Sequence, residues 1–118
     1  MAKVLIIEDN VDLLDFFDFF LKRKGFETQT ISSKDEINDG LNDFKPDLIL
    51  LDIWLGADDG REICKEIKKN NQSLPIILMS ANAKLLENYT NWSADDIIEK
   101  PFDISNILIK INKLLSAV

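Results

Sequence analysis

The sequence predicts an α/β fold, in which a parallel sheet carries helices on both of its faces. The strongest signal is the segment 46–52, where four consecutive large aliphatic residues follow Pro-Asp and lead into Asp52. An apolar run without polar alternation is typical of a strand that is buried on both faces, as in the middle of a parallel sheet. Further apolar runs at residues 4–7, 76–79 and 97–98 alternate with segments of helical periodicity. This alternation predicts parallel strands joined by right-handed crossovers.

The chain begins with a predicted strand and a predicted helix. A strand over residues 3–7 precedes a helix that runs from Val11 to about Lys24. Asn10 can cap the start of this helix, and Gly25 stands just past its end, where glycine is favoured.

The first helix has one apolar and one polar side. At about 100° per residue, the apolar side contains Leu13, Leu14, Phe16, Phe17, Phe20 and Leu21. Phe19 falls on the polar side, next to Arg23. A single exposed apolar residue is common in soluble proteins, but this one could also belong to a surface for a partner. Both interpretations stay open.

A half-exposed strand and a less regular helix follow. Residues 26–31 alternate apolar and polar side chains, which indicates a strand at the edge of the sheet. Ser33 and Glu36 form a capping-box pattern that opens a helix to about Phe44. Gly40 lies inside this helix and lowers its expected regularity.

The second half of the chain continues the alternation of strands and helices. We expect, in order, a loop over 53–59, a helix over 60–70, a strand over 76–79, a helix over 83–89, a strand over 97–98 and a last helix capped by Asp103. The helix over 83–89 has the weakest apolar periodicity, so it should be the least stable.

Length and composition fit a single soluble domain spanning residues 1–118. The chain is 46% hydrophobic and 30% charged, which is typical of globular proteins. No apolar run approaches the roughly 18 residues of a membrane span, and the start has no signal-peptide pattern. We therefore expect a cytoplasmic protein without membrane insertion. The net charge of −7 argues against direct nucleic-acid binding, because phosphate contacts depend on clustered lysine and arginine.

The contents of cysteine and histidine exclude several kinds of site. The single cysteine, Cys64, excludes an internal disulfide and a cysteine-based zinc site. It lies in a helical pattern with Ile63 and Ile67, so we expect it in the core. The chain has no histidine, which excludes imidazole bases, Ser-His-Asp triads and histidine-bound metals. The protein also cannot carry a phosphohistidine itself.

Polar residues stand at the ends of four predicted strands. Glu8 and Asp9 follow the first, Asp52 ends the central one, and Ser80 and Lys100 follow the last two. Ligands of open α/β sheets bind outside the carboxyl ends of the strands, so these residues should meet at one rim. Three clustered carboxylates repel one another, and Mg²⁺ would offset their charge. Exposed acids at loop starts are the alternative, but they do not explain Ser80 and Lys100.

At these positions the chain resembles the receiver domain of two-component response regulators. The matching residues extend over almost the whole sequence and comprise Glu8-Asp9, Asp52, Asp59-Gly60, Ser80-Ala81 and residues 95–102. Each match alone is weak, but the ordered set is specific. The resemblance implies a flavodoxin-like, doubly wound sheet of five strands in the order 2-1-3-4-5, with five helices.

The resemblance also implies a function. Asp52 would be the phosphoacceptor, attacking a phosphoryl group on a histidine of a kinase or phosphotransfer protein. Asp9, Asp52 and the backbone carbonyl of Trp54 would hold Mg²⁺, with Glu8 acting through water. Phosphorylation would then switch a surface that binds an output partner, whose identity stays open.

Two further residues complete the implied site. Lys100 would pair with Asp52 at rest and with a phosphoryl oxygen afterwards, while Ser80 would bind another phosphoryl oxygen. The Lys100-Pro101 bond resembles the cis peptide of the family, an isomer that occurs chiefly before proline.

The sequence departs from the family pattern at two places. The implied switch pairs Ser80 with an aromatic residue three positions before the lysine, and here that residue is Ile97. A branched aliphatic side chain has no ring with a polar tip to swing inward, so we do not expect the usual readout. The second departure is in the loop after Asp52, which has Leu55 where methionine is common in the family and Gly56 where proline is common. In the same loop, Trp54 stands two positions after the phosphoacceptor. It could shield the phosphoryl group from water or be a partly exposed loop residue.

Other functions and assemblies remain possible on the sequence alone. A receiver that never takes phosphate would be a fixed binding module. Phosphatases with a nucleophilic aspartate need a second acid where Trp54 stands, and the four glycines form no phosphate loop. We therefore expect no enzyme activity beyond the protein's own phosphorylation and dephosphorylation. We expect a monomer or a weak phosphorylation-dependent dimer; Lys110 and Lys113 on the last helix suit the family's common dimer face or simply a solvated one.

Overall fold

A five-stranded parallel sheet forms the centre of the protein in the computed structural model, which describes residues 1–116. Its strands, in spatial order, are β2 (Glu27–Ile31), β1 (Lys3–Ile7), β3 (Leu48–Asp52), β6 (Ile76–Ser80) and β7 (Asp96–Glu99). Counted within this sheet, the order is 2-1-3-4-5, so the predicted fold is confirmed. The strand β3 is buried at every position, as its unbroken apolar run predicts.

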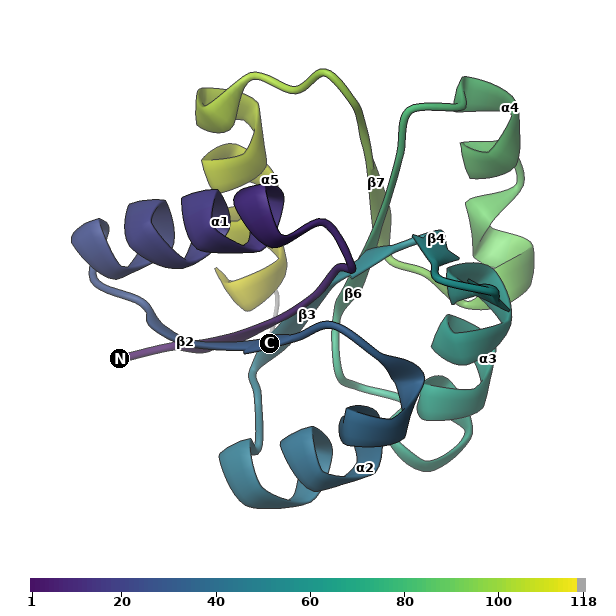
Figure 1. Ribbon diagram of the computed structural model, residues 1–118, viewed down its shortest axis with the longest axis horizontal. Coiled ribbons are helices and arrows are strands. Elements are labelled where there is room, and N and C mark those ends of the chain that lie inside the picture. Colours follow the sequence, from purple (N-terminus) through teal and green to yellow (C-terminus); the bar gives the residue numbers. More distant parts are fainter. Residues whose placement is uncertain (117–118) are drawn as a thin grey trace.

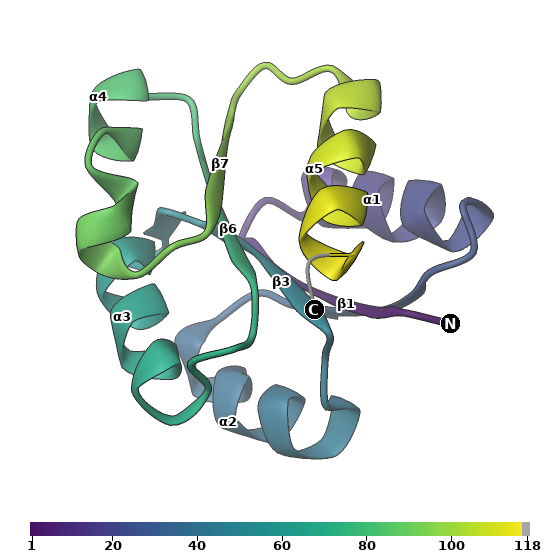
Figure 2. The ribbon, with the colours of Figure 1, turned by 180° about the vertical axis from the view of Figure 1, so that it is seen from behind.

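Helices cover both faces of the sheet (Figures 1 and 2). Their bounds are α1 (Val11–Arg23), α2 (Ile37–Asp39), α3 (Gly60–Asn70), α4 (Ala83–Leu86) and α5 (Ile104–Ser116). The helices α1 and α5 pack on one face, and the other three pack on the opposite face. Within residues 1–116, no helix combines the length and the apolar character that crossing a bilayer requires.

Alternate residues of β1, β3, β6 and β7 supply two separate cores. In β1, Leu5 and Ile7 face the core under α2, α3 and α4, whereas Val4 and Ile6 face the core under α1 and α5. This alternation follows from the two-residue period of a strand. Because both faces are covered, both sets of residues are apolar, and the strands read as continuous apolar runs.

The helix α1 forms as predicted, with one correction to its buried face. Its cap is the predicted one, since the Asn10 Oδ1 atom accepts a hydrogen bond of 3.1 Å from the Leu13 amide. Phe16, predicted on the inward face, is 43% exposed. It lies on the outer side of α1, where its ring contacts the rings of Phe20 and Phe102. Phe19 is 63% exposed, as its polar side predicts.

The predicted helix from Ser33 to Phe44 is broken into three short pieces. They are a 3₁₀ turn (Lys34–Glu36), the helix α2 and a π-helical turn (Gly40–Phe44). The capping box is wrong in detail, because the Ser33 hydroxyl contacts the Glu36 carboxylate at 3.2 Å rather than a backbone amide. A Cβ atom on Gly40 would lie 2.5 Å from Ile31 Cδ1. Glycine therefore lets this segment approach the edge of the sheet closely.

Two other segments differ from the prediction. The expected loop over 53–59 contains a small antiparallel hairpin, formed by β4 (Trp54–Leu55) and β5 (Asp58–Asp59). The expected helix over 83–89 ends early, and a 3₁₀ turn (Tyr89–Trp92) follows it. The weak periodicity of this segment agrees with such an interrupted helix.

Candidate functional site at the carboxyl ends of the strands

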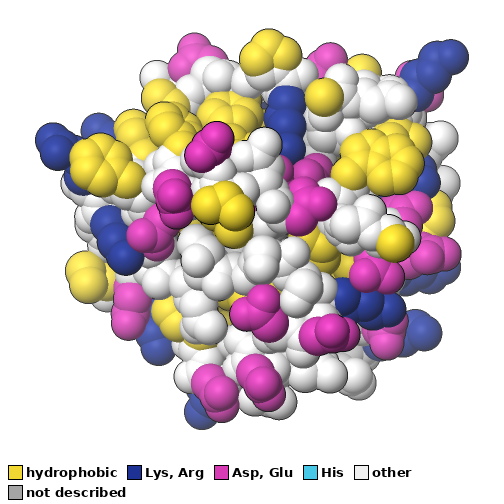
Figure 3. All heavy atoms as spheres, viewed as in Figure 1, with side chains coloured by type: hydrophobic (Ala, Val, Ile, Leu, Met, Phe, Trp, Pro, Cys, Tyr) yellow, Lys and Arg dark blue, Asp and Glu magenta, His cyan; other side chains and the backbone are white. Residues whose placement is uncertain are grey.

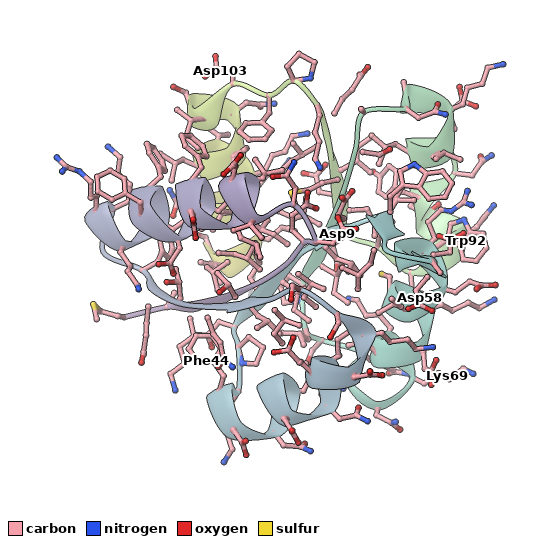
Figure 4. The ribbon with its side chains drawn as sticks, in the orientation of Figure 1. Asp9, Phe44, Asp58, Lys69, Trp92 and Asp103 are labelled. Carbon is pink, nitrogen blue, oxygen red and sulfur yellow. The ribbon has the colours of Figure 1, made fainter. Side chains whose placement is uncertain are left out.

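The carboxyl ends of the parallel strands bring residues from distant parts of the chain together. Because β1 and β6 both pair with β3, with Ile7 opposite Leu51 and Met79 opposite Asp52, Glu8 and Ser80 follow at the same edge as Asp52. Figure 4 shows Asp9 at this edge, between the first turn of α1 and β4.

Lys100 joins two of the acidic residues. Its Nζ atom lies 3.2 Å from Glu8 Oε1 and 3.3 Å from Asp52 Oδ2. Its backbone amide donates a hydrogen bond of 2.8 Å to the carbonyl of Ser80, which holds the residue beside the end of β6. The bond between Lys100 and Pro101 is cis. The amine of Lys100 thus contacts Asp52, the residue that it was expected to contact.

Glu8, Asp9 and Asp52 form a compact acidic cluster. One carboxylate oxygen from each residue lies within 4.8 Å of the others. Glu8 is only 1% exposed and Asp52 only 5%, whereas Asp9 is exposed. The Asp9 carboxylate accepts a hydrogen bond of 2.9 Å from the Gly56 amide, so the β4–β5 hairpin is tied to the cluster.

Burial makes the charge of Glu8 costly. Among residues 1–116, no group donates a hydrogen bond to its Oε2 atom. The pKa of Glu8 is raised from 4.5 to about 8, mainly by loss of hydration and then by the neighbouring Asp52, while Lys100 acts in the opposite direction. When protonated, Glu8 can donate a hydrogen bond to Asp52, which favours the neutral form. A cation near Oε2 would have the opposite effect and stabilise the ionised form.

Ser80 lies at the same edge with its hydroxyl group partly engaged. The residue is fully buried, and its Oγ atom accepts a hydrogen bond of 3.0 Å from the Asn82 amide. The O–H bond of the hydroxyl remains available as a donor. Asn82 in turn caps the start of α4, because its side chain accepts a hydrogen bond from the Lys84 amide.

Gly60 contributes through its lack of a side chain. Its amide donates a hydrogen bond of 2.6 Å to the carbonyl of Ile53. A Cβ atom here would lie 2.8 Å from the Ile53 Cα atom and would overlap the carbonyl oxygen of Asp52. In the sequence, Gly60 is recognisable only as part of the pair Asp59-Gly60. The available signal was a glycine directly after Asp59, which caps α3 by accepting a hydrogen bond from the Arg61 amide.

Three residues that the sequence motifs singled out, Asp95, Ile97 and Trp54, lie outside the acidic cluster. Asp95 lies at the amino ends of β6 and β7. Its carboxylate there contacts the Lys68 amine at 2.6 Å and accepts a hydrogen bond from the amide of Ile76, the first residue of β6. Ile97 is half-buried on β7 and lines a hollow of about 510 Å³ beside α4. Trp54 is exposed on β4.

A large hollow of the described residues lies away from this site. It measures about 830 Å³ and lies at the amino ends of the strands, beside Pro46 and Pro75. None of the acidic residues of the cluster lines it. The chemistry of the side chains, rather than the size of a cavity, therefore marks the functional site.

Comparisons with known proteins agree with this geometry. Residues 4–112 match the family model of the response regulator receiver domain. The crystal structure of NtrX from Brucella abortus is 32% identical, with a TM-score of 0.91; the match covers 98% of this chain and 28% of NtrX. The isolated receiver domain of NtrX matches with 32% identity and a TM-score of 0.90, covering 98% of this chain and 99% of that one.

A further match is a two-component response regulator from Clostridium difficile. It is 29% identical, with a TM-score of 0.90, and the match covers 98% of this chain and 97% of that chain. The chain thus spans only the receiver part of a long regulator such as NtrX, but nearly all of the shorter relatives. The family predicted from the acidic pair, the strand-final aspartate and the lysine is therefore confirmed: this protein belongs to the response regulator receiver domains.

Proposed function

We propose that this protein is a cytoplasmic phosphoacceptor, which takes a phosphoryl group on Asp52 from a histidine of a kinase or phosphotransfer protein. An oxygen of the Asp52 carboxylate attacks the phosphorus atom and forms a new O–P bond. The P–N bond of the donor breaks, and its electron pair returns to the imidazole. The absence of histidine from this chain fits a role as acceptor rather than donor.

The acidic cluster has the properties of a Mg²⁺ site. Mg²⁺ prefers carboxylate oxygens together with water, and three carboxylates lie within 4.8 Å of one another here. The Oε2 atom of the buried Glu8 also has no donor within residues 1–116. Asp9, Asp52 and the Trp54 carbonyl would hold the ion, with Glu8 acting through water. When bound, the ion offsets the repulsion between the carboxylates and the incoming phosphoryl group.

Lys100 and Ser80 would position the phosphoryl group. The Lys100 amine already contacts the Asp52 carboxylate at 3.3 Å. It can follow the new negative charge onto a phosphoryl oxygen without a large movement. The Ser80 hydroxyl would donate a hydrogen bond to another oxygen. The Lys100 amine and the Ser80 hydroxyl would therefore stabilise the negative charge of the phosphoryl oxygens on Asp52.

Movement of Ser80 offers a route from phosphorylation to an output surface. A rotation of its hydroxyl towards the phosphoryl group would break the hydrogen bond from Asn82, the residue that caps α4. This helix has only four residues and adjoins the hollow lined by Ile97. A shift of α4 over Ile97 would then change the surface that is offered to an output partner. This shift would take the place of the swinging aromatic ring that the family uses.

The observation that carries this proposal is the contact of one lysine with two buried carboxylates at the end of the central strands. Acetyl phosphate with Mg²⁺ tests it, with intact mass measured by mass spectrometry. Wild type should gain one phosphoryl group, stable in acid and labile in base. Asp52→Asn should gain none, and Asp39→Asn, which changes an exposed acid on α2, should behave like wild type.

The same experiment separates the alternatives. Labelling that persists in Asp52→Asn would place the acceptor elsewhere. A fixed binding module would take up no phosphate even though its fold is intact, which circular dichroism can establish. The rate of free phosphate release can also be compared with the rate at which Asp52 gains and loses its phosphoryl group. A faster release would indicate an enzyme of another class. It would contradict the proposal that the protein catalyses only its own phosphorylation and dephosphorylation.

A further inference from the structure

Four exposed residues form a line along the outer side of α1: Asp12, Phe16, Phe19 and Arg23. Their spacings of four, three and four positions return to the same side of a helix. An acid stands at the amino end of this line, a base stands at its carboxyl end, and two exposed phenylalanines lie between them. We call these four residues the α1 stripe. Figure 3 shows hydrophobic side chains gathered over α1, with charged side chains around them.

The α1 stripe is complementary to itself. If a second α1 is turned by half a turn and laid antiparallel on the first, Phe16 meets Phe19 and Phe19 meets Phe16. In the same register, Asp12 meets Arg23 at both ends, because each pair of positions has the same midpoint on the helix. A parallel arrangement would instead oppose Asp12 to Asp12 and Arg23 to Arg23, and like charges repel.

We propose that the α1 stripe binds a second copy of this chain and forms a two-fold symmetric, antiparallel dimer. Such an interface is isologous, so every contact occurs twice. The two phenylalanines of each copy supply apolar area, and the two Asp12–Arg23 pairs select the antiparallel direction and the register. This dimer does not depend on phosphorylation, unlike the weak dimer expected from the family resemblance.

Three side chains of the α1 stripe, those of Phe16, Phe19 and Arg23, already make contacts within the single chain. The Phe16 ring stacks on Phe20 and also contacts Phe102, with ring centres 6.0 and 6.1 Å apart. The guanidinium of Arg23 lies over the ring of Phe19, 5.4 Å from its centre. Side chains that are held before binding lose less conformational entropy when they bind. The stripe is therefore better prepared for an interface than a freely rotating surface residue.

Ile109 on α5 provides the contrast. It is 65% exposed, nearly the same as Phe19. Its neighbours one turn away on the helix are polar, namely Ser105, Asn106, Asn112 and Lys113. It is thus an isolated apolar residue of the kind found on most protein surfaces, and it serves as a matched control.

The dimer should be weak and sensitive to salt. One helix side per copy buries less area than the roughly 1,600 Å² of a standard stable interface. The Asp12–Arg23 pairs lie at the rim, where salt screens the attraction between charges. We therefore expect dimers at micromolar to millimolar concentrations of the chain, with fewer dimers at high salt.

The first test compares Phe19→Ser with Ile109→Ser by sedimentation equilibrium over that range of concentrations. Phe19 occurs twice in the interface, so its replacement should weaken self-association at least tenfold, about 1.4 kcal/mol. Ile109→Ser and Asp52→Asn should both associate like wild type. The second of these variants separates this proposal from the phosphorylation proposal. A wild-type chain that stays monomeric, or an Ile109→Ser variant that loses the dimer, would overturn the α1 interface.

The second test exchanges the charges at the ends of the stripe. Asp12→Arg alone and Arg23→Asp alone each oppose like charges at both ends, so each variant should be monomeric. A mixture of the two should form a heterodimer, because every Arg then faces an Asp. The double variant should regain the wild-type dimer. Neither residue belongs to the acidic cluster, and circular dichroism can establish that each variant folds.

The outcome of the exchange also separates a second copy from another protein as the occupant of the stripe. If the partner were a different protein, its own charges would stay unchanged in this experiment. The double variant of this chain would then still oppose like charges and would not regain binding to that partner. A purified mixture that remains monomeric would therefore refute the self-complementary stripe and leave a different protein as the occupant.

Discussion

Replacement of Glu8 by glutamine should remove a loss of stability that the wild-type protein suffers as the pH rises. Glu8 is buried, and within residues 1–116 its Oε2 atom accepts no hydrogen bond. Burial, followed by the effects of Asp52, raises the pKa of this carboxyl group to about 8. Glutamine has nearly the same shape, carries no charge and can donate a hydrogen bond to Asp52.

The sign of the effect follows from the protons bound in each state. Between pH 4.5 and about 8, the folded protein keeps a proton on Glu8 that the unfolded chain has lost. The free energy of unfolding therefore falls as the pH rises through this range. At about 1.4 kcal/mol per pKa unit, the shift from 4.5 to about 8 corresponds to at most about 5 kcal/mol. It is an upper limit because the site can relax around the charge.

The measurement is urea unfolding at a series of pH values without Mg²⁺, followed by tryptophan fluorescence. The chain has no histidine, so few other groups titrate in this range. The difference in unfolding free energy between Glu8→Gln and wild type should increase from pH 5 to pH 8. Glu87→Gln, which changes an exposed carboxylate, should parallel wild type. A difference that is constant with pH would refute the reasoning about Glu8.

Four more predictions follow from the packing and the site. Gly60→Ala should cost about 3 kcal/mol of unfolding free energy, because the new Cβ would overlap the Asp52 carbonyl; urea unfolding unchanged from wild type would contradict this. Gly56→Ala should cost only about 1 kcal/mol of unfolding free energy, because φ is 59° but no atom lies within 4 Å of the new Cβ. A larger loss of unfolding free energy than in Gly60→Ala would contradict this comparison. Phe17→Ala should cost about 4 kcal/mol, since the ring is fully buried; a loss below about 1 kcal/mol would show that the core closes around the gap. Trp54→Asn should shorten the lifetime of phosphate on Asp52 if the indole excludes water, and equal decay rates would rule out this shielding.

The parts of the fold that depend on burial could be predicted well from the sequence. Four of the five strands of the sheet contain a predicted apolar run, because a strand covered on both faces has apolar residues on both. The edge strand β2 instead follows the alternation of apolar and polar residues that predicted it. The helices α1, α3 and α5 also lie near their predicted bounds. Their apolar periodicity extends over several turns, so one irregular residue does not obscure it.

The parts that depend on contacts between distant segments could not be predicted. The helix after Ser33 is broken into pieces, and Gly40 in the last piece lies close to Ile31 on the edge strand. The hairpin within residues 53–59 is joined to the acidic pair by the hydrogen bond from Gly56 to Asp9. Neither contact leaves a periodic pattern in the sequence, because each joins two separate segments of the chain. The strands of the hairpin are also too short, at two residues each, to show periodicity.

The sequence by itself determined which chemical groups end the strands, and therefore which family this protein belongs to. Only the tertiary structure decided how those groups differ from one another. Glu8 and Asp9 are neighbours in the chain, yet the amide of Glu8 continues the pairing of β1 with β2 and its side chain is buried. Asp9 already belongs to the turn into α1 and is exposed. Hydration controls the cost of a charge, so the pKa of Glu8 rises because the fold buries its side chain, which no local pattern in the sequence shows.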